Sequence, residues 1–161
     1  MRNAIRAGVL GLVLAAAGCD APAPPATVVD PVVKSDDATA VEMIRPLAEQ
    51  GDAEAQYNLG LMYKIGQGVP QDYAETVKWY RKAADQGLND AQNNLGVMYY
   101  SGMGVPQDYV QAHLWFSLAA AAGNRNALGG RNQVAAKMTP GQIAEAQKLA
   151  QQWAPKKVAT P

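Results

Sequence analysis

A repeat of 36 residues organises the middle of this 161-residue chain. The stretch A-Q-Y-N-L-G-L-M-Y that begins at Ala55 returns as A-Q-N-N-L-G-V-M-Y from Ala91, and V-P-Q-D-Y returns at the same spacing from Val69 to Val105. Three glycines keep the same interval: Gly51, Gly87 and Gly123. A fixed period of this length is typical of arrays in which stacked supersecondary units bury a shared core.

Two helices are predicted in each unit. Ala55, Leu59 and Met62 lie at i, i+4 and i+7, which gives the first segment one apolar stripe. The second segments carry apolar stripes as well, formed by Tyr73, Thr76, Tyr80 and Ala83 in one unit and by Tyr109, Ala112, Phe116 and Ala119 in the next.

The residues at the ends of these segments support the helix limits. Asp72 and Glu75 have the N-cap and N3 spacing of a reciprocal capping box, as do Asp108 and Gln111. Gly87 and Gly123 fall where a second helix should end in a left-handed residue. The mid-helix glycines, Gly60 and Gly96, predict a close helix crossing that leaves no room for a Cβ.

These motifs resemble the Sel1-like repeat, a relative of the tetratricopeptide repeat: A-x-x-x-L-G-x-x-Y, then G-x-G-V-P-Q-D-Y, then Trp followed by Tyr or Phe. Two full copies cover residues 52–87 and 88–123. The resemblance implies an all-α fold in which antiparallel helix pairs stack into a right-handed α-solenoid, an architecture commonly used as an adaptor surface. It also implies that residues 39–50 form a preceding second helix.

A third unit, residues 124–154, departs from the pattern. It lacks the Leu-Gly-x-x-Tyr core and the G-x-G-V-P loop. An apolar stripe with Pro140 near its start still predicts a helix: Ile143, Ala146, Leu149, Ala150 and Trp153. We interpret this unit as a degenerate cap that closes a repeat domain over 38–154, with its register open, followed by a tail over 155–161.

Residues 1–18 have the layout of a secretory signal peptide, because Arg2 and Arg6 precede an uncharged run that ends at Gly18. That run of 12 residues would reach about 18 Å as a helix, short of the roughly 30 Å hydrocarbon core of a bilayer.

Two cleavage sites are compatible with this end of the chain, and we favour the one that makes the protein a lipoprotein. Residues 15–17 suit ordinary signal peptidase, and residues 16–19 resemble a bacterial lipobox that would lipidate Cys19, the single cysteine. In the first case the protein would be soluble in the periplasm or secreted. In the second, the Pro-rich and Ala-rich residues 19–37 would tether it to a membrane facing the periplasm, inner or outer.

Charge is distributed unevenly along the chain. Residues 20–122 hold 13 acidic and 6 basic residues, whereas 123–161 hold 6 basic residues and one acidic residue. Export and the acidic body argue against a nucleic acid partner. The basic end is more compatible with a weak contact to a membrane surface through Arg125, Arg131, Lys137, Lys148, Lys156 and Lys157.

The sequence gives little support for a catalytic function. His113 is the single histidine and is predicted at the surface or at an edge of the fold, and without further His or Cys ligands no metal site is expected. The G-x-G loops lack the lysine and hydroxyl of a phosphate-binding loop, so no cofactor is expected. Some Sel1-like proteins have been described as β-lactamases with a disulfide in each repeat, cysteines that this chain lacks. The alternative of an envelope enzyme such as a hydrolase would need acids not used as helix caps.

Binding of another protein or peptide segment is therefore the predicted function. Stacked first helices line the concave surface of related solenoids, and Tyr and Asn suit contact surfaces. Trp79 and Trp115 are instead predicted to pack internally. The candidate contact residues are Tyr57, Asn58, Leu61 and Lys64 on one first helix and Asn93, Asn94, Val97 and Tyr100 on the next. The oligomeric state is left open.

Overall fold

The protein is described by a computed structural model over residues 36–156. This range contains helices and no strands: α1 (Asp36–Glu49), α2 (Ala53–Ile65), α3 (Tyr73–Asp85), α4 (Asn89–Ser101), α5 (Tyr109–Ala121), α6 (Arg125–Ala135) and α7 (Pro140–Gln152). None of these helices is both long and apolar enough to cross a bilayer. The signal peptide, Cys19 and residues 157–161 of the tail lie outside the described residues, as does nearly all of the tether.

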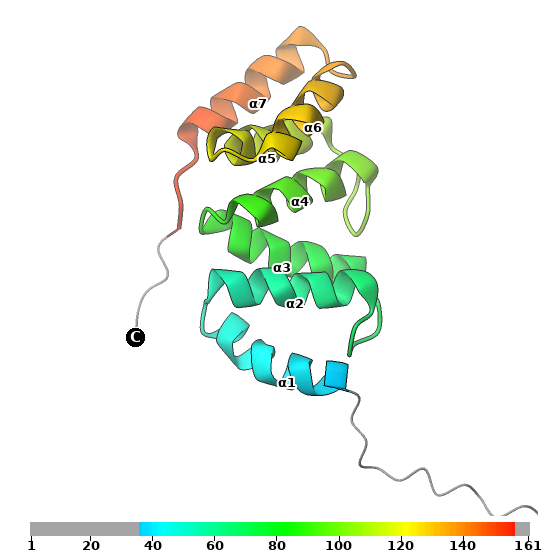
Figure 1. The fold of residues 1–161 in the computed structure, drawn as a ribbon. Helices are drawn as coiled ribbons and strands as arrows, with labels where there is room; N and C mark the ends of the chain where they lie inside the picture. The colour runs from blue at the N-terminus through cyan, green and yellow to red at the C-terminus, as the bar shows by residue number, and fades with distance from the viewer. Residues whose placement is uncertain (1–35, 157–161) are drawn as a thin grey trace, which may run out of the picture. The chain divides into compact units, whose positions relative to one another are not determined.

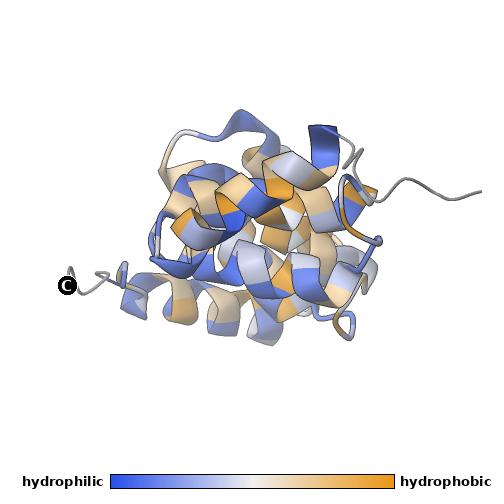
Figure 2. Cartoon of the chain, turned by 90° about the horizontal axis from the view of Figure 1, so that it is seen from below, coloured by the Kyte–Doolittle hydropathy of each residue, from blue (hydrophilic) through white to orange (hydrophobic). Residues whose placement is uncertain are grey.

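The two full repeats are helix pairs that stack on one another (Figure 1). α2 packs against α3, α4 packs against α5, and the α3–α4 contact joins the pairs. Each helix carries both hydrophobic and hydrophilic residues, interspersed along its length (Figure 2). The main core includes Tyr80, Leu95, Trp115 and Phe116, and Trp79 belongs to a second buried cluster. The all-α repeat fold and the packing role of both tryptophans are confirmed.

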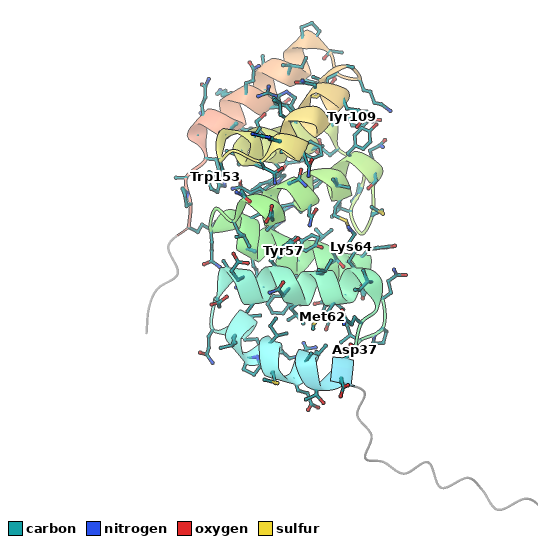
Figure 3. All side chains as sticks on the ribbon, viewed as in Figure 1. Asp37, Tyr57, Met62, Lys64, Tyr109 and Trp153 are labelled. Carbon is teal, nitrogen blue, oxygen red and sulfur yellow. The ribbon has the colours of Figure 1, made fainter. Side chains whose placement is uncertain are left out.

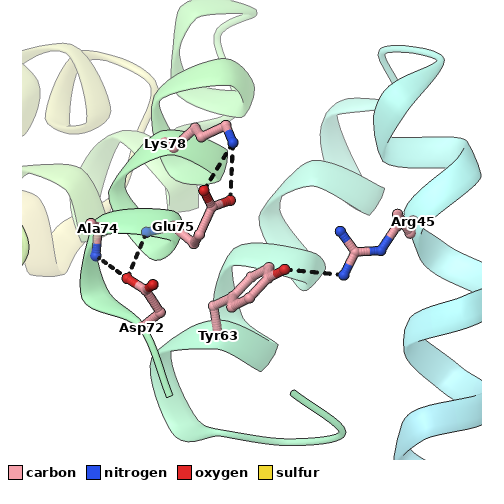
Figure 4. A network of polar contacts seen from close by, with 6 residues as sticks. All are labelled: Arg45, Tyr63, Asp72, Ala74, Glu75 and Lys78. Carbon is pink, nitrogen blue, oxygen red and sulfur yellow. Dashed lines mark hydrogen bonds and ion pairs between the residues drawn. The ribbon is translucent and has the colours of Figure 1, made fainter. Parts of the chain in front are cut away.

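The predicted N-caps form, but only half of each predicted capping box does. The Asp72 carboxylate accepts from the Ala74 and Glu75 amides at 2.8 and 3.0 Å (Figure 4). The Glu75 side chain does not reach back, because it pairs with Lys78 one turn along the helix. A reciprocal box is found instead in the degenerate unit, between Thr139 and Gln142.

The mid-helix glycines lie at close helix crossings, as predicted. A Cβ on Gly60 would come within 2.7 Å of the Tyr80 ring, and one on Gly96 would come within 2.8 Å of the Phe116 ring. Contacts this short exceed what a packed interior tolerates. The helix pairs can therefore close only because these two residues have no side chain.

α1 has the contacts of a second helix from a preceding repeat. Gln56 donates to the Ala48 carbonyl at 3.0 Å, and Gln92 donates to the Ala84 carbonyl at 3.2 Å, 36 positions later. Arg45 lies over the Tyr63 ring, as Arg81 lies over that of Tyr99. The prediction of a second helix before the first full repeat is confirmed, and α1 begins at Asp36 rather than at residue 39.

One face of α1 lacks the cover that its counterpart on α3 receives. Trp79 and Ala83 on α3 are buried, whereas the equivalent residues of α1, Met43 and Leu47, are 72% and 51% exposed. In α3 this face packs against α2, the first helix of the same repeat. Within the described residues no first helix precedes α1, so its apolar face is open, with Met62 of α2 at its edge (Figure 3).

The third unit is not a regular helix pair. Its first helix keeps the repeat register, since Ala127 is buried like Ala91 and a Cβ on Gly130 would lie 2.7 Å from the Phe116 ring. The connection to the next helix shortens from seven residues (102–108) to four (136–139). α7 then packs mainly against α5, with Trp153 edge-on to Trp115 at 6.5 Å.

The chain beyond α7 returns to the first full repeat. The backbone amide of Lys156 donates to the Asp85 carbonyl at 2.7 Å, and its ammonium group pairs with the Asp85 carboxylate at 2.6 Å. This contact joins the end of the described chain to the end of α3. Lys156, assigned to the tail by sequence, therefore contacts the first full repeat.

Candidate functional site

The predicted contact residues occupy equivalent positions on α2 and α4, and we call them the α2–α4 surface. Most are half-buried, and Asn58 is exposed. Figure 3 shows Tyr57 and Lys64 on α2 of the first repeat. Some of these residues hold the repeats together, others have polar side chains with no partner within residues 36–156, and Leu61 and Val97 are aliphatic.

Tyr57 and Asn94 belong to the first of these groups. The Asn94 amide donates to the Tyr57 hydroxyl at 3.2 Å and so links α2 to α4. The Tyr57 ring stacks on Tyr80 at 5.5 Å. Burial raises the pKa of Tyr57, and the charges of Asp90 and Glu54 raise it further. The pKa of Tyr80 is also raised by burial. Both phenols therefore stay neutral and serve packing.

Tyr100 also packs within the protein. Its ring lies 5.8 Å from that of Tyr109, and the Lys137 ammonium lies over both rings, 5.2 Å from Tyr100 and 5.9 Å from Tyr109. The side-chain hydrogen bond with Tyr100 raises the pKa of Lys137. A cation above two aromatic faces is a stabilising arrangement at a surface, so this cluster fastens the degenerate unit to the second repeat.

Asn58, Asn93 and Lys64 form the second group. Within residues 36–156 their side chains make no hydrogen bond or ion pair with the protein. Leu61 and Val97, at equivalent positions of α2 and α4, lie beside them and are half-buried. The α2–α4 surface thus offers two free amides, a free ammonium group and two partly exposed aliphatic side chains.

A cavity that sequence reasoning missed lies between α5, α6 and α7. It has a volume of about 460 Å³. Ala135, Ile143 and Ala150 form its apolar wall. Its polar lining residues are His113, Ser117, Arg131, Asn132, Gln147 and Gln151. We call it the α5–α7 cavity.

His113 lies in the wall of this cavity, and the prediction of a surface histidine is wrong. Only 4% of its surface is exposed. Burial lowers its pKa, and the positive charge of Arg131 lowers it further, so the imidazole is neutral at pH 7. Its Nδ1 lies 3.3 Å from the Ser117 hydroxyl. The signal that could have revealed its burial is its repeat equivalence with Val77, an apolar residue that is also buried.

The described residues offer limited means for catalysis. No group of three His, Cys, Asp or Glu side chains that could hold a metal occurs within residues 36–156. His113 and Ser117 form a base and a hydroxyl, but the cavity lining contains no carboxylate to orient the imidazole. The arrangement can instead donate hydrogen bonds and attract negative charge.

Comparison with known proteins assigns the repeats. The family model described as the Sel1 repeat matches residues 53–88 and 89–124. The chain carries two Sel1 repeats. Each match begins one residue after the repeat limits expected from the sequence. The Sel1-repeat fold is generally a protein–protein interaction fold and is typically non-catalytic.

Two solved structures share this Sel1-repeat fold. One is c5321, a protective antigen present in uropathogenic Escherichia coli strains, which is 41% identical with a TM-score of 0.72 over 75% of this chain. The other is a Sel1 repeat protein from Oxalobacter formigenes, also 41% identical, with a TM-score of 0.60 over 62% of this chain. The matches span 26% and 29% of those two proteins. Among curated proteins none matches.

Proposed function

We propose that this Sel1-repeat protein is an adaptor of a bacterial cell envelope that binds a segment of another protein on its α2–α4 surface. The observation that carries the proposal is the pair of free amides, Asn58 and Asn93, on adjacent repeats beside Leu61 and Val97. An asparagine side chain both donates and accepts hydrogen bonds, so it can pair with the backbone of an extended segment. The aliphatic neighbours provide apolar area.

The charges around this surface suggest which segment fits. Glu54 and Asp90 lie in the first turns of α2 and α4, whereas Lys64 lies in the last turn of α2. Lys137 extends the positive end beyond Tyr100. A segment with basic residues toward one end and acidic residues toward the other would be complementary, and charge complementarity chiefly sets specificity and association rate.

The binding surface is tested with a photo-crosslinking amino acid placed in the full chain in cells, at Asn58 or at Asn93. Both positions should capture the same partner, because the proposal places one bound segment across both repeats. The matched control position is Lys78, whose exposed side chain is on α3. The double variant Asn58→Ala, Asn93→Ala should weaken binding of the captured partner by about tenfold, since each lost hydrogen bond contributes roughly 0.5–1.5 kcal/mol.

Tyr57 and Asn94 are left unchanged in this test, because their replacement would also loosen the contact between α2 and α4. Equal capture from Lys78, or full binding by the double variant, would rule out the α2–α4 surface.

Anchoring through Cys19 is the second part of the proposal. A lipidated cysteine followed by residues 19–37 would hold the repeats near partners in the envelope and raise their effective concentration. The variant Cys19→Ala should move the protein from the membrane fraction to the soluble fraction, which immunoblotting of fractionated cells measures. Continued membrane association of the variant would exclude Cys19 as the anchor.

For the enzymatic alternative, the described residues offer one base beside a hydroxyl, His113 and Ser117. This alternative is disfavoured because a dyad needs a third group to orient the base, and the lining of the α5–α7 cavity contains no acid. We therefore retain binding as the function.

A further inference from the structure

The α5–α7 cavity has a physical origin in the irregular third unit. In the full repeats the two helices of a unit pack directly against each other, as α4 packs against α5. In the third unit the short connection over 136–139 sends α7 onto α5 instead. The space between α6 and α7 is then not filled by a helix contact, and the side chains of three helices line it.

The charge in this cavity is positive and uncompensated. The Arg131 guanidinium forms no hydrogen bond or ion pair with any residue of 36–156, and no acidic residue lines the cavity. A guanidinium group presents paired N–H donors that match the two oxygens of a carboxylate. An unpaired arginine inside a concave site therefore favours an anionic ligand.

His113 adds a second polar side chain to the cavity lining. Its imidazole is buried in the cavity wall, beside the Ser117 hydroxyl. A neutral imidazole whose Nδ1 accepts from that hydroxyl carries its proton on Nε2, which then can donate. The side-chain amides of Asn132, Gln147 and Gln151 line the same cavity and have no partner within the described part of the chain.

From these groups we infer that the α5–α7 cavity binds an organic carboxylate with a short aliphatic tail. Arg131 pairs with the carboxylate, and His113 and the amides supply further donors. Ile143, Ala135 and Ala150 cover the tail. A ligand with a free amino group is disfavoured, since no acidic side chain of the lining could pair with an ammonium group. This site is separate from the α2–α4 surface and does not depend on the proposed adaptor function.

The inference is tested by titrating the isotopically labelled full chain and following backbone amide signals by NMR. Pentanoate should shift the signals of residues lining the cavity and saturate at millimolar concentration, whereas pentanamide, which has the same shape without the charge, should not. N-acetyl-leucine represents the C-terminus of a peptide. Tighter binding of N-acetyl-leucine would identify a peptide end as the source of the carboxylate, and equal or weaker binding would identify a small acid.

Two variants and one control separate the cavity from general charge effects. Arg131→Gln should weaken pentanoate binding at least tenfold, and Gln151→Glu should do the same by adding a carboxylate to the lining of the cavity. Lys148→Gln removes one positive charge from α7 outside the lining and should leave binding unchanged. No saturable shift with pentanoate, equal shifts with pentanamide, or unchanged binding in both folded variants would overturn the inference.

Discussion

Leu95→Ala should lower the free energy of unfolding by about 2–5 kcal/mol, the range for a buried leucine whose surroundings relax only partly. Leu95 is 0% exposed and lies in the main core with Tyr80, Trp115 and Phe116. These large side chains come from two other helices, α3 and α5, so the movement of one helix cannot close the space left by the substitution. The loss is measured as the shift in the midpoint of urea unfolding.

The matched control is Leu128→Ala on α6, a leucine that is 46% exposed. It should cost less than about 1 kcal/mol, since much of its surface already contacts water. Repeat arrays can unfold in parts, so circular dichroism and tryptophan fluorescence should be followed together. Trp115 lies in the same core as Leu95 and reports on that part. Equal losses for the two variants would show that α4 does not present Leu95 to the core.

The four helices of the full repeats could be predicted because two copies of one pattern constrain each other. Gly60 and Gly96 are unfavourable inside helices when considered singly, but their shared spacing from Tyr80 and Phe116 indicates a required contact. The N-caps were predictable for the same reason. The reciprocal half of the capping box was not, because the Glu75 side chain can form an ion pair with Lys78, and sequence spacing does not rank the two options.

The second helix of the third unit could not be placed by analogy with the full repeats. Its first helix keeps the register through Ala127, but the shorter connection over 136–139 removes the geometric basis for placing α7 by analogy with α5. The packing of α7 on α5 and the α5–α7 cavity follow from that change. The cavity could not be found from sequence periodicity, because its lining comes from three helices. Each helix contributes only two to four of the lining residues.

On the α2–α4 surface, the sequence could not separate residues available for binding from residues that hold the repeats together. Half-buried Tyr and Asn residues suit both a binding surface and a contact between repeats, since each combines apolar area or an amide with a modest loss of conformational freedom. The structure assigns Tyr57 and Asn94 to the repeat contact through their hydrogen bond. Among residues 36–156 it shows no partner for the side chains of Asn58 and Asn93, and this difference, which sequence alone does not contain, directs the binding experiment.

Gly104→Ala should destabilise the protein by more than about 2 kcal/mol, because two effects add. Gly104 has a φ of 72°, and residues with a Cβ lose roughly 1–2 kcal/mol in this left-handed region. A Cβ there would also collide with the backbone at the start of α3, at the Tyr73 carbonyl and the Ala74 amide. Backbone atoms cannot turn aside as a flexible side chain can, so the loop or the helix must shift. Thermal and urea unfolding measure the loss.

Gly123→Ala measures the backbone strain alone. Gly123 has a φ of 92°, and a Cβ there would meet nothing within 4 Å. Its replacement should cost only the backbone strain, roughly 1–2 kcal/mol. The Gly104 variant should lose more unfolding free energy than the Gly123 variant, and the difference measures the contact between the loop and α3. Equal losses in the two variants would mean that the loop does not pack on that helix.

Gly68→Ala extends this series to the N-terminal end of the stack. Its Cβ would collide with the backbone of Asp37 and Ala38 in the same way as Gly104 does with that of α3. Among the described helices α1 packs mainly against α2, whereas α3 is held by both α2 and α4. α1 can therefore yield more easily, and the loss at Gly68 should fall between those at Gly123 and Gly104. A loss at Gly68 as large as that at Gly104 would show that α1 is held as firmly as a helix with neighbours on both sides, which would imply that its open apolar face is covered in solution.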